Sequence, residues 1–116
     1  MRASYSTETL TLPTFIAGDF KRVTRKVTIL AGAALAAGAV LGRVTTSGKF
    51  TLSATAAGDG SETPRAILAE ALPASGADQE AIVYLSGEFR ADGLTFGAGH
   101  SAASTRDGLR DLSIFI

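Results

Sequence analysis

The sequence VTRKVTI at residues 23–29 decides the expected fold, because its side chains alternate with a period of two. Val23, Val27 and Ile29 fall on one face of the segment, and its threonine and lysine side chains fall mainly on the other. This alternation is typical of a β-strand whose two faces meet different surroundings. We therefore predict a strand at residues 23–29.

The chain beyond this strand is divided by glycines into further short runs. Residues 49–53 alternate after a Ser-Gly turn signal, and residues 81–86 form a compact apolar run that stops at Gly87. Residues 112–116 alternate again, which predicts that this end of the chain is tied into a sheet. The runs together indicate a domain built mainly of short strands.

The apolar stretch at residues 27–42 is the most membrane-like part of the sequence. Its 16 residues fall short of the roughly 20 that a spanning helix needs. Within it, residues 31–39 are rich in alanine, but Gly32 and Gly38 each cost a helix about 1 kcal/mol relative to alanine. We therefore expect no membrane span, and we favour a loop that leads into a short strand at residues 40–44.

Two later segments are helix candidates. Residues 64–72 (PRAILAEAL) have the strongest local helix propensity, with Thr63 as a cap and Pro64 at the first helical position. Their apolar side chains also suit a short buried strand, so propensity alone leaves that alternative open. Residues 104–110 are the second candidate, because acidic and basic side chains alternate along them.

Charge divides the sequence into two parts. The 116 residues suit one domain, and 11 basic residues balance 11 acidic ones, which argues against nucleic-acid binding through bulk positive charge. Residues 1–26 hold five basic and two acidic residues, a net of +3, whereas residues 27–116 hold six and nine, a net of −3. We predict an N-terminal arm at residues 1–26 and a single β-rich domain at residues 27–116.

The apolar content of 46% overstates the supply of core-forming side chains. Alanine accounts for 21 of these residues, and the chain holds 13 glycines besides. A monomer of this size buries only about two-thirds of the surface that its unfolded chain exposes. A chain with few bulky apolar groups is therefore expected to complete its burial by associating with other copies.

The N-terminal arm is rich in threonine, with Leu10, Leu12 and Pro13 among the threonines, a composition that favours extended backbone. Composition alone favours equally an arm that binds a partner, a free tail and an edge strand of its own domain. Four basic residues follow: Lys21, Arg22, Arg25 and Lys26. Because no aromatic side chains are interleaved with them, a protein surface or solvent is favoured over nucleic acid as their contact.

Residues that commonly carry catalysis are scarce. Cysteine is absent and His100 is the one histidine, which excludes a cysteine site or a multi-histidine metal site within one chain. His100 lies in a glycine-rich stretch, which predicts a solvated loop histidine and not the base of a triad. The sequence GDGS at residues 58–61 lacks phosphate-loop spacing and carries an aspartate that would repel phosphate, so it indicates a glycine turn. We predict no enzyme, cofactor or metal site.

A set of segments, in order along the chain, carries a resemblance to a known family. The segments are IAGDF at residues 16–20, GAVLG at 38–42 with GKF at 48–50, AAGDGSETPRAILAEAL at 56–72, VYLSGEFRADGLTFG at 83–97 and LRDLSIFI at 109–116. Together they cover most of the chain. On these segments the sequence resembles the bacteriophage head decoration protein D family, a group of small capsid-cementing proteins.

The resemblance implies a fold and an assembly. The expected fold is mainly β with little helix, a small sandwich-like or barrel-like domain of the β-tulip type with an extended N-terminal arm. The expected assembly is a homotrimer. Residues 64–72 are extended under this resemblance, against their local helix propensity, which is a modest preference that tertiary contacts override.

The resemblance also implies a structural function on the virion. After synthesis in the host cytoplasm, trimers of such proteins bind the outer surface of the expanded icosahedral head at threefold and quasi-threefold positions. They hold the major capsid protein against the pressure of packaged DNA, and the arm adds a strand to a sheet of that protein. The implied capsid-binding residues of the arm are Tyr5, Thr7, Thr9, Leu10, Thr11, Leu12, Pro13, Thr14, Phe15 and Ile16.

A threonine-rich arm suits this role, because strand addition draws its affinity from backbone hydrogen bonds. Ordering the arm costs roughly 1–2 kcal/mol per residue, so one arm binds weakly and three arms on one trimer raise the effective concentration. The basic residues at 21–26 would add an electrostatic contact with the shell. No direct nucleic-acid, membrane or small-molecule partner is expected. The alternative is a trimeric β-domain that binds carbohydrate or a host surface on a phage tail, where exposed aromatic side chains are expected.

Overall fold

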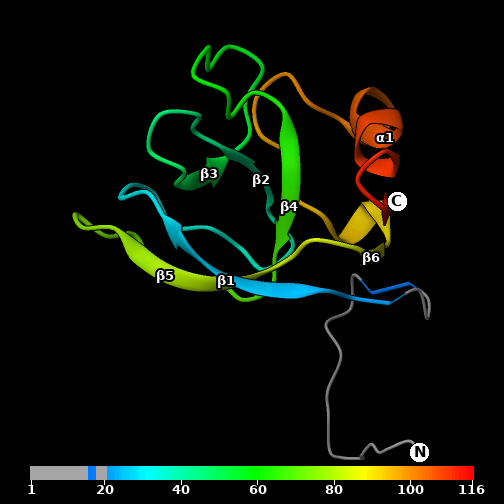
Figure 1. Cartoon of the computed structure of the whole chain (residues 1–116), viewed down its shortest axis with the longest axis horizontal. Coiled ribbons are helices and arrows are strands. Elements are labelled where there is room, and N and C mark those ends of the chain that lie inside the picture. The colour runs from blue at the N-terminus through cyan, green and yellow to red at the C-terminus, as the bar shows by residue number, and fades with distance from the viewer. Residues whose placement is uncertain (1–15, 18–20) are drawn as a thin grey trace, which may run out of the picture.

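The strands of the computed structural model, which describes residues 16–17 and 21–116, curl into a barrel with one α-helix beside it (Figure 1). In chain order the elements are β1 (Thr24–Ile29), β2 (Val40–Arg43), β3 (Phe50–Leu52), β4 (Pro64–Leu68), β5 (Gln79–Tyr84), β6 (Gly87–Glu88), the 3₁₀ turn η1 (Ala91–Gly93), α1 (Ala102–Arg110) and β7 (Ile114–Phe115). The strands predicted at residues 23–29, 40–44, 49–53, 81–86 and 112–116 are confirmed as β1, β2, β3, β5 and β7, with shifts of one or two residues at their ends.

The barrel closes in the order β1-β3-β2-β4-β5. β1 runs antiparallel to β5 along its whole length, from Thr24 opposite Tyr84 to Ile29 opposite Gln79. On its other side β1 meets β3 in parallel at one pair, Ile29 and Phe50. β3, β2, β4 and β5 are joined by antiparallel pairs along the barrel wall. β1 and β3, in contrast, are paired at this one position only.

Two apolar clusters lie on the two sides of the wall that contains β2 and β4. The barrel core consists of Ile29, Ala39, Leu41, Phe50, Ala66, Leu68, Ala81 and Val83. The outer core consists of Val40, Ile67, Phe89, Leu94, Leu109 and Ile114. Because successive residues of a strand point to opposite faces, β2 and β4 contribute side chains to both cores.

The helix that propensity favours at residues 64–72 is wrong. The first five of these residues form β4, which pairs with β2 on one side and β5 on the other. Ala66 and Leu68 enter the barrel core and Ile67 enters the outer core. Differences in helix propensity among such residues are less than about 1 kcal/mol each, and burial of both strand faces outweighs them. The extended conformation implied by the family resemblance is confirmed for β4.

The second helix candidate is confirmed as α1, which begins two residues earlier than predicted. Ser101 caps it, because its side chain accepts a hydrogen bond from the Ser104 N–H at 3.2 Å while the Ser104 hydroxyl accepts one from the Ser101 N–H at 2.9 Å. Thr105 and Leu109 are the buried residues of α1, and Leu109 packs in the outer core. The helix therefore covers the outer face of β4.

Four further features of the fold correspond to expectations from the sequence. Residues 31–39 form a loop, as predicted, and this loop pairs with the chain at Gly32–Ser75 and Leu35–Leu72. The C-terminal strand is tied into a sheet, because β7 pairs in parallel with β6. Among residues 16–17 and 21–116, no helix is long and apolar enough to cross a membrane. Of the two forms expected, sandwich-like or barrel-like, the structure shows a closed barrel.

Candidate binding surface

The N-terminal segment joins the domain at the outer edge of β6. Ile16 forms an antiparallel bridge with Phe89, and the Ala17 N–H donates to the carbonyl of Glu88 at 3.0 Å. Ile16 is half-buried and packs against the outer core. Because the other edge of β6 pairs with β7, residues 16–17 extend this small sheet by one short segment.

The predicted capsid-binding arm falls largely outside the residues that the structure describes. Of the predicted residues, Ile16 is described, and it contacts its own domain at Phe89. The other predicted arm residues, from Tyr5 to Phe15, lie outside the described residues. Ile16 therefore marks the point where the arm meets the barrel, and we call residues 16–17 the arm root.

A buried serine fixes the chain between the arm root and β1. The Ser86 hydroxyl donates to the carbonyl of Lys21 at 2.8 Å and accepts from the Val23 N–H at 3.1 Å. Ser86 is only 9% exposed. The backbone at Lys21 and Val23 is therefore held against Ser86, in the short connection between β5 and β6.

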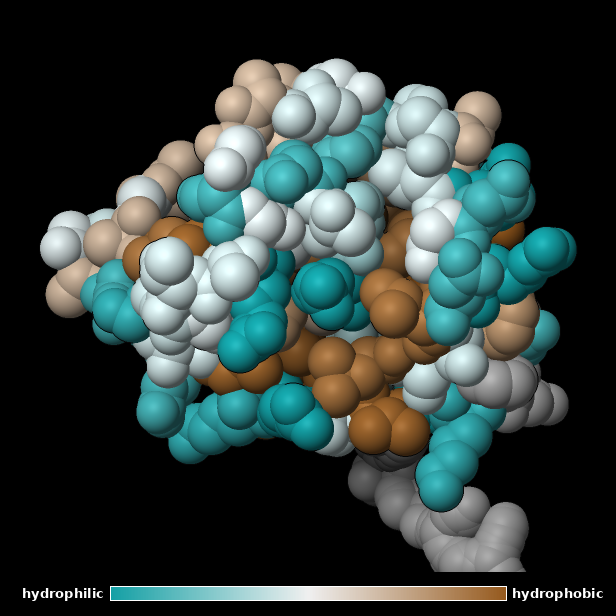
Figure 2. Space-filling model, turned by 45° about the horizontal axis from the view of Figure 1, so that its top comes forward, coloured by the Kyte–Doolittle hydropathy of each residue, from teal (hydrophilic) through white to brown (hydrophobic). Residues whose placement is uncertain are grey.

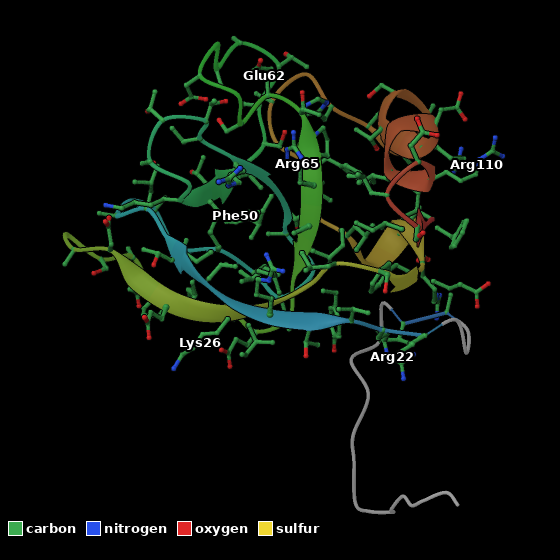
Figure 3. The ribbon with its side chains drawn as sticks, viewed as in Figure 1. Arg22, Lys26, Phe50, Glu62, Arg65 and Arg110 are labelled. Carbon is green, nitrogen blue, oxygen red and sulfur yellow. The ribbon has the colours of Figure 1, made fainter. Side chains whose placement is uncertain are left out.

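The basic cluster predicted at residues 21–26 does not form one patch. Arg25 and Lys26 are neighbours in β1, so their side chains point to opposite faces of the strand. Lys26 forms an exposed ion pair with Glu80 at 3.4 Å. In Figure 3, Lys26 and Arg22 point away from the side on which Arg65 lies. Arg25 is thus directed away from Lys26, and it meets cations of other strands at a groove that Lys26 also borders.

Gly87, at the start of β6, permits the close packing around this segment. Its φ of 143° lies in the region that favours glycine. A Cβ at this position would lie 2.9 Å from Cγ of Arg22 and 3.0 Å from Cζ of Phe89. A glycine is therefore required at position 87, both for its backbone angle and for the space that its neighbours leave.

A groove of about 750 Å³ lies along β1, where β1 and β3 part. We call it the basic groove, because five basic residues line it: Arg25, Lys26, Arg43, Lys49 and Arg65. Phe50, Leu85 and Leu112 are apolar residues of the same lining, and Glu80 is its acidic member. Figure 3 labels Phe50 on β3 and Arg65 on β4, two strands that β2 separates in the barrel.

One of the groove's cations is neutralised at the end where β1 and β3 meet. Lys49 Nζ lies 2.5 Å from Oδ2 of Asp78, and Oδ1 of Asp78 accepts a hydrogen bond from the Ala31 N–H at 2.9 Å. These contacts, the one with Lys49 foremost, hold the pKa of Asp78 below its ordinary value. Asp78 therefore ties the turn before β5 to β3 and to the residue just beyond β1.

The other cations leave the groove with an excess of positive charge. Lys26 has Glu80 as its partner. Within the part of the chain that the structure describes, Arg25, Arg43 and Arg65 form no ion pair. The groove therefore presents three uncompensated guanidinium groups on β1, β2 and β4.

Exposed apolar side chains adjoin the groove. Val23 and Leu112 are 42% and 38% exposed, and they line a second hollow of about 370 Å³ together with Lys21 and Leu85. Leu85 and Leu112 also line the basic groove, so the two hollows share part of their lining. Figure 2 shows one face of the molecule, on which apolar side chains gather between hydrophilic ones.

Sequence reasoning missed Arg43, Lys49 and Arg65 as members of a binding surface. Each stands alone in the sequence, on or beside a different strand. No spacing motif links them, because the barrel closure is what brings them together. The sequence offers one weak hint: these three cations are half of the basic residues in residues 27–116, a part of the chain whose net charge is negative.

His100 lies in a loop, as predicted, but it is partly buried and hydrogen-bonded instead of freely solvated. It is half-buried, with Nε2 at 3.1 Å from the Ser53 hydroxyl and 2.9 Å from the Glu62 carbonyl oxygen. Because a carbonyl oxygen only accepts hydrogen bonds, the contact with Glu62 places the proton on Nε2. His100 thereby links the residue after β3 to the loop before β4. No group of three or more metal-ligating side chains occurs within the described ranges.

The glycine turn predicted at residues 58–61 is confirmed. Gly58 and Gly60 have φ angles of 71° and 103°. Asp59 Oδ1 accepts hydrogen bonds from the Ser61 hydroxyl at 2.5 Å and the Ser61 N–H at 2.9 Å. These hydrogen bonds lower the pKa of the Asp59 carboxyl from its ordinary value. The carboxylate is thus occupied within its own turn.

The structure is a small β-barrel protein with a strand-like arm root at one sheet edge and a cationic groove beside another strand. The family model for the bacteriophage lambda head decoration protein D matches residues 4–115, and the chain belongs to this family. Membership implies association with the phage capsid as a structural protein of the head. A search of curated proteins found no match.

Proposed function

We propose that this protein is a capsid decoration protein that acts as a homotrimer. Trimers bind the outer surface of the expanded head at threefold and quasi-threefold positions and stabilise it against the pressure of packaged DNA. The N-terminal arm, comprising the predicted residues from Tyr5 to Ile16, adds a strand to a sheet of the major capsid protein. No catalytic step, metal or cofactor takes part in this function.

The observation that carries the proposal is the extent of the family match, because residues 4–115 include the arm as well as the barrel. The arm root supports the mode of binding. Residues 16–17 already pair in strand fashion with residues 88–89, so the arm meets the domain in an extended conformation at a sheet edge. An arm that begins in this way is suited to strand addition.

The alternative of a carbohydrate-binding module receives less support from the aromatic residues. Sugar-binding surfaces of that type need exposed rings, yet Phe50 and Phe89 are 8% and 3% exposed. The Tyr84 ring packs against Phe89 with centroids 5.5 Å apart. Among the described residues, the exposed large apolar side chains are the aliphatic Val23, Ile82 and Leu112.

Two truncations test the function of the arm. Removal of residues 1–15 keeps Ile16 on Phe89, whereas removal of residues 1–20 also strips the outer edge of β6. We expect both proteins to sediment as trimers and neither to bind expanded, undecorated heads in a co-sedimentation assay. Full binding by the shorter truncation would contradict the arm hypothesis, and a monomer of the full chain would contradict the trimer.

Mixed trimers test whether the three arms act together. Full-length and truncated chains are co-refolded and separated by a tag on the truncated chain. We expect apparent affinity for heads to fall with each arm removed, by at least about tenfold per arm, because linked arms raise each other's effective concentration. Equal affinity of trimers with one, two and three arms would show that the arms do not cooperate.

A further inference from the structure

One edge of β1 is open. The Leu85 N–H donates to the carbonyl of Val23 at 2.7 Å, so residue 23 and every second residue after it direct their backbone groups toward β5. The backbone groups of Thr24 and Lys26 point the other way. Within the described ranges, no backbone hydrogen bond reaches these two residues from that side, since β3 joins β1 only at Ile29.

This open edge faces the basic groove. Residues 25–28 of β1 line the groove directly. Arg25 lies on the same face of β1 as Val27 and Ile29, and Ile29 belongs to the barrel core. Arg25 is therefore directed to the open side of the barrel, where Arg43 and Arg65 also line the groove. Unpaired backbone groups and unpaired cations thus occur side by side.

We propose that the basic groove binds an extended acidic segment of a partner protein, which pairs through its backbone with the free edge of β1. The identity of that partner as the capsid shell protein rests on the proposed function. The barrel then accepts a strand from the shell in addition to donating its arm. Because alternate residues of a strand share a face, acidic side chains at every second position of the segment would meet Arg25, Arg43 and Arg65.

The groove suits a peptide better than a nucleic acid. A strand edge offers N–H and C=O groups in alternation, which match another peptide backbone and not a chain of phosphates. Single-stranded nucleic acids are held by stacking on exposed aromatic rings, yet Phe50, the aromatic residue of the lining, is only 8% exposed. The apolar continuation at Val23, Leu85 and Leu112 also suits the apolar side chains of a strand.

The location of the groove supports the same partner as the arm. The second hollow shares Leu85 and Leu112 with the basic groove and is also lined by Lys21 and Ser86, and Ser86 holds the backbone at Lys21. A shell protein engaged by the arm would thus meet adjoining apolar and cationic surface along the barrel. Contacts at both places would share the entropy cost of a single docking event.

A blocked peptide of alternating glutamate and valine probes the groove directly, by NMR titration of the labelled full-length protein. We expect saturable shifts at Thr24, Lys26 and Phe50, and slower amide exchange at Thr24 and Lys26 as their N–H groups become paired. Arg25→Glu and Arg65→Glu should each weaken the peptide by roughly fivefold to tenfold. Arg110→Glu, at an exposed position of α1, changes the net charge equally and should leave the affinity for the peptide unchanged.

Four results would contradict the proposal. One is the absence of saturable shifts in the groove, and a second is equal affinity of Arg65→Glu and Arg110→Glu. The third is binding of a short oligothymidylate or of inorganic phosphate to the groove as tightly as the peptide, which would assign it to phosphate recognition. Unchanged amide exchange at Thr24 and Lys26 on peptide binding would remove the strand pairing and also count against it.

Binding to heads separates this proposal from the decoration function. If both hold, Arg25→Glu and Arg65→Glu proteins decorate expanded heads more weakly than wild type, and Arg110→Glu decorates them normally. Normal decoration by the groove variants, with no peptide binding, would reject the groove and leave decoration intact. Peptide binding by a wild-type protein that never decorates heads would instead reject the decoration function while retaining the acidic-peptide site.

Discussion

β4 and β1 are strands of the same barrel that meet their surroundings differently. β4 has a partner strand on each side, and its residues Ala66, Ile67 and Leu68 are each 0% exposed. β1 has a partner along one side, and its first three residues are exposed. The difference indicates that stability is concentrated in the wall around β4, whereas β1 keeps backbone and charge available for binding.

Truncation of Ile67 to alanine should have the largest effect on stability. Ile67 lies in the outer core, and a large-to-small change at a fully buried site costs about 2–5 kcal/mol in the free energy of unfolding. Denaturant unfolding measures this loss. Ile82→Ala, on β5 at 36% exposure, is the matched control and should cost about 1 kcal/mol or less. Equal losses of unfolding free energy in Ile67→Ala and Ile82→Ala would contradict the view that stability is concentrated in the wall around β4.

The same difference explains which strands could be predicted from the sequence. β1 has one face toward the core and one toward solvent, so its alternation was sufficient. β4 is buried on both faces at Ala66, Ile67 and Leu68, so this part of its sequence is an apolar run with good helix formers, and local propensity favours the wrong structure. The two strands that flank β4 decide its conformation, and they are distant in sequence.

The binding surface was less predictable than the fold. The basic residues at 21–26 are adjacent in sequence, yet strand alternation sends Arg25 and Lys26 to opposite faces. Arg43 and Arg65 join Arg25 only because closure of the barrel brings β2 and β4 to the groove that runs along β1. The free edge of β1 is likewise a property of pairing, since β3 begins only at Phe50, opposite Ile29 at the end of β1.

Loss of the α1 cap tests the outer side of β4, with a smaller effect than Ile67→Ala. Ser101→Ala removes the acceptor for the Ser104 N–H and should cost about 1 kcal/mol in the free energy of unfolding. Ser101→Asn should recover most of that loss, because asparagine is an equally good N-cap. If alanine and asparagine were equally destabilising by thermal denaturation, the contribution of Ser101 would lie outside capping.

The pH dependence of stability tests the contact that holds β1 and β3 together at one end. The pKa of Asp78 is lower in the folded protein than its ordinary value of 3.8. Its carboxylate therefore contributes stability that is fully present above the unfolded pKa and is lost as pH falls through the folded pKa. Asp78→Asn should flatten the acid limb of a plot of unfolding midpoint against pH.

Lys49→Met separates the two partners of Asp78 in the same measurement. This variant removes the ion pair but keeps the hydrogen bond from the Ala31 N–H to Oδ1. Because the contact with Lys49 is the largest cause of the lowered pKa, Lys49→Met should reproduce most of the flattening seen with Asp78→Asn. An acid limb that stays as steep as wild type in both variants would show that this contact does not hold the strands.

Removal of a groove arginine should have the smallest effect and the opposite sign. Arg25, Arg43 and Arg65 line one groove without ion-pair partners in the described part of the chain, so Arg65→Gln relieves repulsion and should raise stability by no more than about 0.5 kcal/mol. The gain should vanish at high salt, where exposed charges are screened.

Arg110→Gln is the matched control for the small gain in stability expected of Arg65→Gln. Arg110 lies in the last turn of α1, where a cation interacts favourably with the helix dipole, so its loss should lower stability slightly. Thermal midpoints of the two variants, measured at low and high salt, should therefore move in opposite directions at low salt and converge at high salt. A decrease for Arg65→Gln would mean that the groove cations contribute to the stability of the free barrel. The contrast between a stabilising β4 wall and a β1 side kept open for binding would then no longer hold.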